Sequence, residues 1–357
     1  MKKIHFNQLF KAKSKPTVGI DIGSNSIKIV EFQGEGAGRT LKRIGRAGIP
    51  MDSIVDGSIK DSETVSATLK RLLNNLDIRT KRASASISGY SVIVKRITVP
   101  YETEKDIEDN LLAEAEKYVP FEIDEVYIDF YILSGPDKEK PGSDIFLVAA
   151  KKEIVDQYAG LLESVGLTPA VIDVDAFALG NSFELAFGNV TEPAALVDIG
   201  ASKTNLNVII NGTPIFARDM AIGGNQLTEA ISDTTGLDRE ESERLKISGS
   251  KDDSLRQEAA GLIREYMELW ADEIKKAIDF YRSGSPVEEH PKHLFLSGGS
   301  TLFKGIENQF QQRMKMDVSR LNPFARLGQV KEINPEYLDE VAPQFAIASG
   351  LGIRSSE

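Results

Sequence analysis

The sequence contains no cysteine, which excludes disulfides and thiolate metal sites. Its three histidines, His5, His290 and His293, do not have the spacing of metal ligands. No apolar run reaches the roughly 18 residues of a membrane span, and no signal-peptide core follows the first lysines. These absences predict a protein that neither spans a membrane nor is exported. The formal net charge of -11, with basic residues dispersed among acids, argues against nucleic acid as a partner.

What is present is enough apolar sequence for more than one core. The chain has 357 residues, of which 41% are hydrophobic, and this predicts at least two lobes. Residues 1–16 form a basic leader with five lysines and no acid, interleaved with Ile4, Phe6, Leu9 and Phe10. We expect a frayed, solvated leader, and contact with an anionic membrane surface is the alternative.

One pattern occurs twice along the chain. Residues 17–31 and 194–208 share an apolar strand, an Asp-Ile-Gly turn, a small polar loop and a second strand with alternating apolar residues. Each segment predicts a β-hairpin, with Asp21 and Asp198 at equivalent strand ends. Two hairpins of one design suggest two lobes of one fold.

The remaining patterns predict helices and strands around these hairpins. Apolar spacing and flanking breakers predict helices at 64–76, 103–118 and 152–165, paired strands within 83–99, and strands at 127–133 and 145–150. Together, these elements predict that residues 83–166 form a small inserted subdomain. A largely helical stretch follows at 238–279, then a strand at 293–296 that enters Ser297–Ser300, and a last apolar segment at 345–353.

The hairpin loops have the chemistry of a polyphosphate clamp. Glycines let backbone amides approach phosphate oxygens, and the loops 23–26 and 200–204 add hydroxyl groups and Lys203. Asp21 and Asp198 can hold Mg²⁺ through water, because magnesium keeps much of its hydration shell and takes only one or two carboxylates. Either loop alone also fits ordinary Asp-x-Gly turn chemistry, so the prediction rests on their repetition.

Two further elements fit a nucleotide less specifically. Gly298 and Gly299 end a strand and could pack flat against a base and ribose, although Ser300 or Thr301 could equally cap a helix there. Glu243 and Lys246 lie at i,i+3 on one helical face, a spacing that also describes an ordinary surface ion pair.

Taken in order, these elements resemble the superfamily of actin, sugar kinases and large heat-shock chaperones. The resemblance implies an actin-like, ribonuclease H-like α/β fold with two lobes, duplicated mixed sheets of five strands each, and an inserted 1C-type subdomain. Within it, the sequences Gly19–Lys28, Ala115–Phe121 and Val174–Ala178 resemble the PilM family of type IV pilus assembly proteins, in the branch shared with the cell-division protein FtsA. The implied domains are a leader (1–16), subdomain 1A (17–82), the 1C insert (83–166), a return to the first lobe with a connecting helix (167–193), subdomains 2A and 2B (194–344) and a C-terminal connecting helix (345–357).

The resemblance also implies a site for ATP and Mg²⁺. Asp21 and Asp198 would hold the metal through water, and Asp175 would occupy the position that orients the attacking water in relatives. A helix cap is the alternative for Asp175, and its short side chain predicts slow turnover or none. The implied ATP contacts are Gly23, Ser24, Asn25, Ser26, Lys28, Gly200, Ser202, Lys203, Thr204, Gly223, Gly224, Glu243, Lys246, Gly298, Gly299 and Ser300.

Members of the PilM family grip the cytoplasmic N-terminal tail of the inner-membrane protein PilN with a groove at the insert. By resemblance we expect PilN-tail binding, with Tyr90, Arg96 and Tyr118 as candidate contacts; each could equally be core or solvated surface. Homo-oligomers, other pilus-platform proteins, motor ATPases and peripheral association with the inner membrane are further expectations. The alternatives are an FtsA-like polymerising protein and a small-molecule kinase of the same superfamily.

Overall fold

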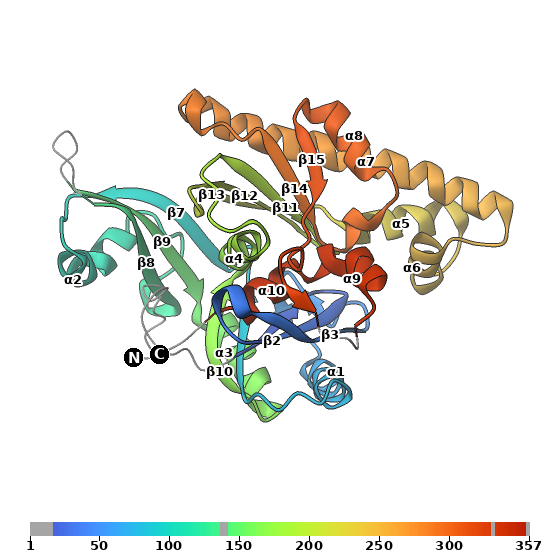
Figure 1. Cartoon of the computed structure of the whole chain (residues 1–357), viewed down its shortest axis with the longest axis horizontal. Helices are drawn as coiled ribbons and strands as arrows, with labels where there is room; N and C mark the ends of the chain where they lie inside the picture. Colours follow the sequence, from blue (N-terminus) through green and yellow to red (C-terminus); the bar gives the residue numbers. More distant parts are fainter. Residues whose placement is uncertain (1–16, 136–141, 330–332, 355–357) are drawn as a thin grey trace.

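The computed structural model describes residues 17–135, 142–329 and 333–354. The basic leader and the last three residues, on which some of the predictions fall, lie outside these ranges. Figure 1 shows two sheets, one above the other, with α4 (Asp175–Phe187) and α10 (Ala346–Gly352) between them. A third, smaller sheet stands to one side. In the described residues, no helix combines the length and apolarity needed to cross a bilayer.

The first sheet has six strands in the order β10-β6-β1-β2-β3-β16. The resemblance predicts five; the sixth is a two-residue strand that adds to β3 in parallel. Side chains alternate across β2, so that Ile29 faces the helices α1 and α3 while Val30 faces α9 and α10. The elements are β1 (Val18–Ile22), β2 (Ser26–Gln33), β3 (Thr40–Gly48), β6 (Arg82–Ile87), β10 (Thr168–Val174), β16 (Gly328–Gln329), α1 (Ser62–Asn75), α3 (Lys152–Ser164) and α9 (Pro335–Val341).

The second sheet has five strands in the order β13-β12-β11-β14-β15. Val197 and its alternate neighbours on β11 face a core shared with α5, α7 and α8, whereas Leu196 faces α4 and α10. The elements are β11 (Ala194–Ile199), β12 (Thr204–Ile210), β13 (Thr213–Met220), β14 (His293–Ser297), β15 (Asp317–Arg320), α5 (Gly224–Thr235), α6 (Arg239–Ser248), α7 (Asp253–Ser283) and α8 (Ile306–Met314).

The two sheets meet across the crossing of α4 and α10, where small residues allow close backbone approach. A Cβ atom built on Gly350 would lie 1.7 Å from the carbonyl oxygen of Ala178, and one on Gly19 would lie 2.1 Å from that of Ala348. Contacts this short exclude any side chain at either glycine. The backbone of α10 is therefore in direct contact with the backbones of α4 and β1.

The third sheet, in the order β7-β9-β8, carries α2 (Glu104–Ala115) on one face. Its strands are β7 (Val92–Val99), β8 (Val126–Ser134) and β9 (Ser143–Lys151). The predicted pairing of two strands within 83–99 is wrong, because β6 lies between β10 and β1 in the first sheet while β7 pairs with β9. Both ends of the predicted insert, β6 and α3, pack in the first lobe. We therefore propose a narrower insert at 92–151.

Short elements complete the described chain. A two-stranded ribbon pairs β4 (Ile54–Val55) with β5 (Ser58–Ile59). The 3₁₀ helices are η1 (Gly36–Gly38), η2 (Ile123–Glu125), η3 (Val287–Glu289), η4 (Gly299–Leu302) and η5 (Ala342–Phe345). The last of these leads directly into α10.

Candidate functional site

The two repeated hairpins form as predicted and have matching turns. In the first, Asp21 pairs with Lys28 across antiparallel strands β1 and β2; in the second, Asp198 is the equivalent residue on β11. Each turn is closed by the same type of backbone hydrogen bond, from Gly23 to Ser26 at 3.2 Å and from Gly200 to Lys203 at 2.9 Å. The two loops also touch, because the Ser24 hydroxyl donates to that of Ser202 at 2.9 Å. The structure thus brings the two predicted phosphate loops face to face.

A charged cluster lies beneath the loops. Lys28 Nζ forms an ion pair with Asp21 at 2.9 Å, and Asp198 accepts a hydrogen bond from Ser297 at 2.9 Å. Burial, and then the nearby charge of Asp21, raise the pKa of Asp198 to about 7. A cation near the two aspartates would relieve this repulsion. A Cβ atom on Gly23 would point at this cluster, 3.2 Å from Lys28 Nζ, so the glycine keeps the space above it open.

Asp175 lies in the first turn of α4, and its carboxylate faces the second loop. The helix cap is Val174, so the alternative of a capping role for Asp175 is wrong. Both carboxylate oxygens are bound, one by Ser86 at 2.5 Å and the other by Ser88, and Lys203 Nζ lies 3.1 Å away. Burial alone would raise the pKa of Asp175, but Lys203 and the two serines outweigh it and lower that pKa.

Lys203 therefore spans from the second lobe to the first. Its ammonium group donates to Ser88 and pairs with Asp175. Burial opposes the charge, but Asp175 and Asp219 raise the pKa of Lys203 above its ordinary value. The lysine stays charged, as a phosphate contact requires.

The Glu243 and Lys246 pair on α6 is not a surface pair. Their side chains are 13% and 7% exposed and lie 2.5 Å apart. Lys246 also donates to the Gly224 carbonyl at 3.1 Å, and Glu243 accepts from Asn25 of the first loop at 3.1 Å. Thr228 hydrogen-bonds to both charged groups. The i,i+3 spacing alone indicated an ordinary surface ion pair. Asn25, which contacts Glu243, lies far away in the sequence, so the spacing could not reveal it.

The predicted glycines pack against the second loop. Gly224 donates its amide to the Gly200 carbonyl at 3.0 Å, and the Ser300 hydroxyl donates to the same carbonyl at 3.1 Å. A Cβ atom on Gly223 would lie 2.6 Å from a backbone oxygen of this loop. Gly298 has a φ of +91°, while a Cβ atom on Gly299 would meet nothing within 4 Å.

Thr204 stands at the start of β12 and is fully buried. Its hydroxyl donates to the Ile222 carbonyl at 2.8 Å, which ties the second loop to the segment before α5. Every predicted ATP contact is therefore part of, or adjacent to, one connected set of loops.

The residues present fit a nucleotide with magnesium. Two ammonium groups, several hydroxyls and backbone amides are suited to phosphate oxygens. Within the described ranges, no group of three or more histidine, aspartate or glutamate side chains could hold a metal ion. The pair of Asp21 and Asp198 suits a cation that keeps most of its water shell, which Mg²⁺ does.

The three candidate peptide contacts lie in different places on or beside the insert. Tyr90 is 75% exposed in the turn that leads from β6 to β7. Arg96 on β7 pairs with Asp144 on β9 at 2.9 Å. Tyr118 follows α2, with Lys95 Nζ 4.8 Å from its ring centre. The structure therefore does not bring them into one cluster, and their role stays a prediction.

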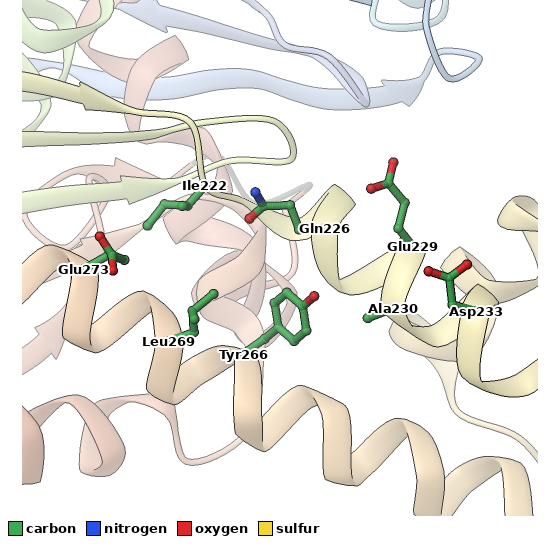
Figure 2. A pocket seen from close by; sticks show the side chains of 8 residues that line it. All are labelled: Ile222, Gln226, Glu229, Ala230, Asp233, Tyr266, Leu269 and Glu273. Atoms are coloured by element: carbon green, nitrogen blue, oxygen red, sulfur yellow. The ribbon is translucent and has the colours of Figure 1, made fainter.

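A separate hollow of about 460 Å³ lies on the second lobe between α5 and α7. Figure 2 shows that Tyr266 and Leu269 reach into it from α7, while Gln226 and Glu229 come from α5. None of the predicted site residues lines it. The second of the predicted phosphate loops contacts α5 at its first residue, Gly224.

Sequence reasoning missed two serines that complete the site. Ser86 and Ser88 hold the carboxylate of Asp175. Ser297, predicted only as part of the segment Ser297–Ser300, holds that of Asp198. A signal was present for the first two, since serines alternate at 84, 86 and 88 along an otherwise apolar strand. Such a polar face in a buried strand needs partners.

The chain matches the family of the type IV pilus assembly protein PilM over residues 19–356. Cell division protein FtsA of Bacillus subtilis (strain 168) is 22% identical over 379 residues, which cover 94% of this chain and 82% of FtsA. In the solved PilM-PilN type IV pilus biogenesis complex, the matched chain is 27% identical with a TM-score of 0.85, over 96% of this chain and 99% of that one. MreB5 of Spiroplasma citri, solved with ADP, is 11% identical with a TM-score of 0.50, over 94% of each chain. The fold is therefore actin-like, and because the family match spans nearly the whole chain, the protein belongs to the PilM family of type IV pilus assembly proteins.

Proposed function

We propose that this protein is an ATP-binding scaffold of the type IV pilus inner-membrane assembly platform, and that it captures the cytoplasmic N-terminal tail of PilN. The observation that carries nucleotide binding is the contact between the two equivalent loops, Ser24 to Ser202, above the cluster of Asp21, Lys28 and Asp198. Family membership and the similarity to a chain of the PilM-PilN complex support the role in pilus assembly.

The phosphates would be held from both lobes. Backbone amides of 23–26 and 200–204, with Lys28 and Lys203, supply donors and positive charge, and Asp21 and Asp198 would orient Mg²⁺ through water. Bound magnesium would neutralise phosphate charge. Glu243 and Lys246, which lie on α6, would contact the nucleoside part of the ligand, next to Gly298 and Gly299. Ligation from two lobes favours their closed arrangement, because a ligand stabilises the state that offers more contacts.

Nucleotide retention tests the first half of this proposal. Purified protein is mixed with ATP and Mg²⁺, desalted rapidly, and its bound nucleotide quantified for wild type, Asp21→Ala and Asp198→Ala. We expect near-stoichiometric retention in wild type and loss in both variants. Asp109→Ala, on the exposed side of α2, is the control for loss of one negative charge. Equal retention in all four proteins would exclude a clamp built on the two aspartates.

Peptide binding tests the second half. A labelled peptide covering the N-terminal tail of PilN from the same organism is titrated with wild type, Tyr90→Ala, Arg96→Ala and Tyr118→Ala. We expect weaker binding in at least one of these insert variants. The control is Tyr337→Ala, because Tyr337 on α9 is also exposed but lies on another part of the molecule. If wild type does not bind the peptide, PilN capture is not a function of this chain.

The similarity to FtsA supports polymerisation as a second candidate function. Sedimentation with ATP separates the two, because a filament pellets above a critical concentration whereas a discrete ring or dimer does not. Homo-oligomers and peripheral attachment to the inner membrane through PilN, with further contacts to platform proteins and motor ATPases, complete the proposal.

A further inference from the structure

The inference concerns the contact surface of the homo-oligomer, so it rests on that part of the proposed function and on neither nucleotide nor PilN binding. The surface is the hollow between α5 and α7, which none of the predicted nucleotide contacts lines. Its volume of about 460 Å³ falls within the range of about 300–1,000 Å³ that is usual for ligand pockets. The hollow therefore has room for side chains of a partner.

The floor of the hollow is apolar. Ile222 and Tyr266 pack on the core of the second lobe, and Ala230 of α5 and Leu269 of α7 line the hollow with them (Figure 2). Leu269 is 46% exposed. Apolar side chains that gather in a concave surface, rather than lying singly on the protein, mark interaction sites.

Carboxylates surround this floor. Glu229 and Asp233 line the hollow from α5, and Glu273 lines it from α7. Two of them also pair with basic side chains at the edge of the hollow, Glu229 with Arg239 and Glu273 with Lys276. These exposed pairs compete weakly with a partner, because surface ion pairs contribute little free energy.

The potential inside the hollow is negative, as Tyr266 reports. Burial, and then the charges of Glu265, Glu229 and Asp233, raise the pKa of the Tyr266 hydroxyl. The carboxylates thus act on the centre of the floor as well as on its edge. An apolar surface with this potential suits a partner that combines apolar side chains with positive charge.

The chain itself contains a segment of that chemistry. Residues 1–16 have five lysines and no acidic residue, in a chain whose formal net charge is -11. Phe6, Leu9 and Phe10 lie close together in this segment, with two lysines before them and three after them. An apolar centre between basic ends matches an apolar floor between carboxylates. Two copies of an acidic chain repel each other, so a contact between opposite charges favours their association.

The segment of the same molecule does not reach the hollow. It precedes Thr17, whose hydroxyl donates to the Arg354 carbonyl at 2.7 Å just before β1. Between β1 and the hollow lie the layer of α4 and α10, the second sheet, and then α5 and α7 (Figure 1). At roughly 10 Å per layer, the hollow is about 30 Å or more from β1. Phe10 lies seven residues before Thr17, and seven extended residues span about 25 Å at most.

We propose that the hollow binds residues 1–16 of a second copy of this chain, with Phe6, Leu9 and Phe10 on its apolar floor and the lysines beside its carboxylates. The donor segment and the hollow are different surfaces, so the contact is head-to-tail. Each molecule gives one segment and receives another. Such contacts build a ring where the rotation between copies closes, and a filament where it does not.

The first test measures self-association of the full chain by sedimentation velocity over a range of protein concentrations. Leu269→Arg places a charge on the apolar floor that repels the lysines, and Phe10→Ser removes an apolar contact from the donor segment. We expect each to weaken association by about tenfold or more, as for a central interface residue. The matched control is Leu112→Arg, because Leu112 on α2 is 55% exposed, and it should associate like wild type. Thermal unfolding checks that each variant is folded, and Asp233→Lys provides a second hollow variant.

Mixing two defective variants tests the direction of the contact. Phe10→Ser keeps an intact hollow and Leu269→Arg keeps an intact donor segment, so each alone should be monomeric. Their mixture should form a one-to-one heterodimer and nothing larger, because a single matched pair of segment and hollow remains. A mixture that stays monomeric overturns docking between copies.

Vesicles test the alternative that the segment contacts a membrane. Wild type, Phe10→Ser and Leu269→Arg are sedimented with phosphatidylcholine vesicles that contain or lack phosphatidylserine. We expect all three to bind equally little to both. If Phe10→Ser alone loses binding to the anionic vesicles, while wild type and Leu269→Arg self-associate equally, the segment serves a membrane and the proposal is overturned.

The outcomes also separate the inference from the proposed function. If wild type self-associates and folded Leu269→Arg associates equally well, the inference fails and the homo-oligomer stands. If wild type is monomeric at every concentration, the inference and the homo-oligomer both fail. Nucleotide retention and PilN-tail binding are decided by their own experiments in either case.

Discussion

Replacing Asp198 with asparagine should stabilise the metal-free protein at neutral and alkaline pH. The carboxylate ends β11, close to Asp21, and accepts a hydrogen bond from Ser297. Burial and the neighbouring charge raise its pKa to about 7, against about 3.9 for an unperturbed aspartate. The folded protein therefore binds a proton that the unfolded chain releases at much lower pH.

The direction of the pH dependence follows from this difference. A pKa raised by folding gives a stability contribution that is complete below about pH 4 and is lost as the pH rises toward 7. Three pKa units correspond to about 4 kcal/mol, an upper bound for a group that Lys28 also contacts electrostatically. Asparagine removes the charge and keeps an acceptor for Ser297. Asp198→Asn should therefore raise the free energy of unfolding by about 2–4 kcal/mol at pH 8 and change little at pH 4.5.

Urea unfolding in the presence of a metal chelator, at several pH values between 4.5 and 8, measures this difference. The quantity to compare is the free energy of unfolding of the variant minus that of wild type. Asp109→Asn, on the exposed side of α2, controls for the change in net charge. If wild type and Asp198→Asn lose stability in parallel as the pH rises, Asp198 is not the buried proton site, and the electrostatic reasoning about the two aspartates is refuted.

Three further substitutions test the packing and charge of the site. Gly298→Ala should cost about 1–3 kcal/mol in urea unfolding, because its φ is +91° and a Cβ atom would lie 2.4 Å from a backbone oxygen, whereas Gly299→Ala meets open space and should cost under about 0.5. Gly350→Ala should sharply reduce soluble yield and melting temperature, because its Cβ atom would overlap the backbone of α4, while Gly160→Ala on α3 meets nothing within 4 Å and should stabilise by about 0.5–1 kcal/mol. Lys246→Met leaves a buried carboxylate unpaired, so it should cost about 3 kcal/mol in urea unfolding and reduce ATP retention.

The repeated hairpins were predictable because their signal is local. An apolar strand, a glycine turn and a second alternating strand are contiguous in the chain, and the register that pairs Asp21 with Lys28 follows from the turn. The match between residues 17–31 and 194–208 then indicated two related lobes. Family resemblance supplied what spacing could not, namely that loops far apart in the sequence surround one ligand.

Partner choice was less predictable than element type. Alternation around 83–99 correctly indicated two strands, but alternation does not encode which strand pairs with which, and β6 and β7 joined different sheets. The Glu243 and Lys246 spacing fits an exposed pair equally well, and only the contact with Asn25 of the other lobe shows why it is buried. Long-range contacts of this kind leave no periodic signal.

The environment of Asp175 argues for a nucleotide-dependent switch over a fast ATPase. A group that activates water needs a pKa near the working pH. Here Ser86 and Ser88 each donate a hydrogen bond to one carboxylate oxygen, and they and Lys203 lower the pKa of the carboxylate. The same contacts weaken Asp175 as a base, so we expect slow turnover of ATP or none. An appreciable turnover number for ATP in wild type, measured by phosphate release and lost in Asp175→Asn, would show instead that Lys203 leaves the carboxylate free during catalysis.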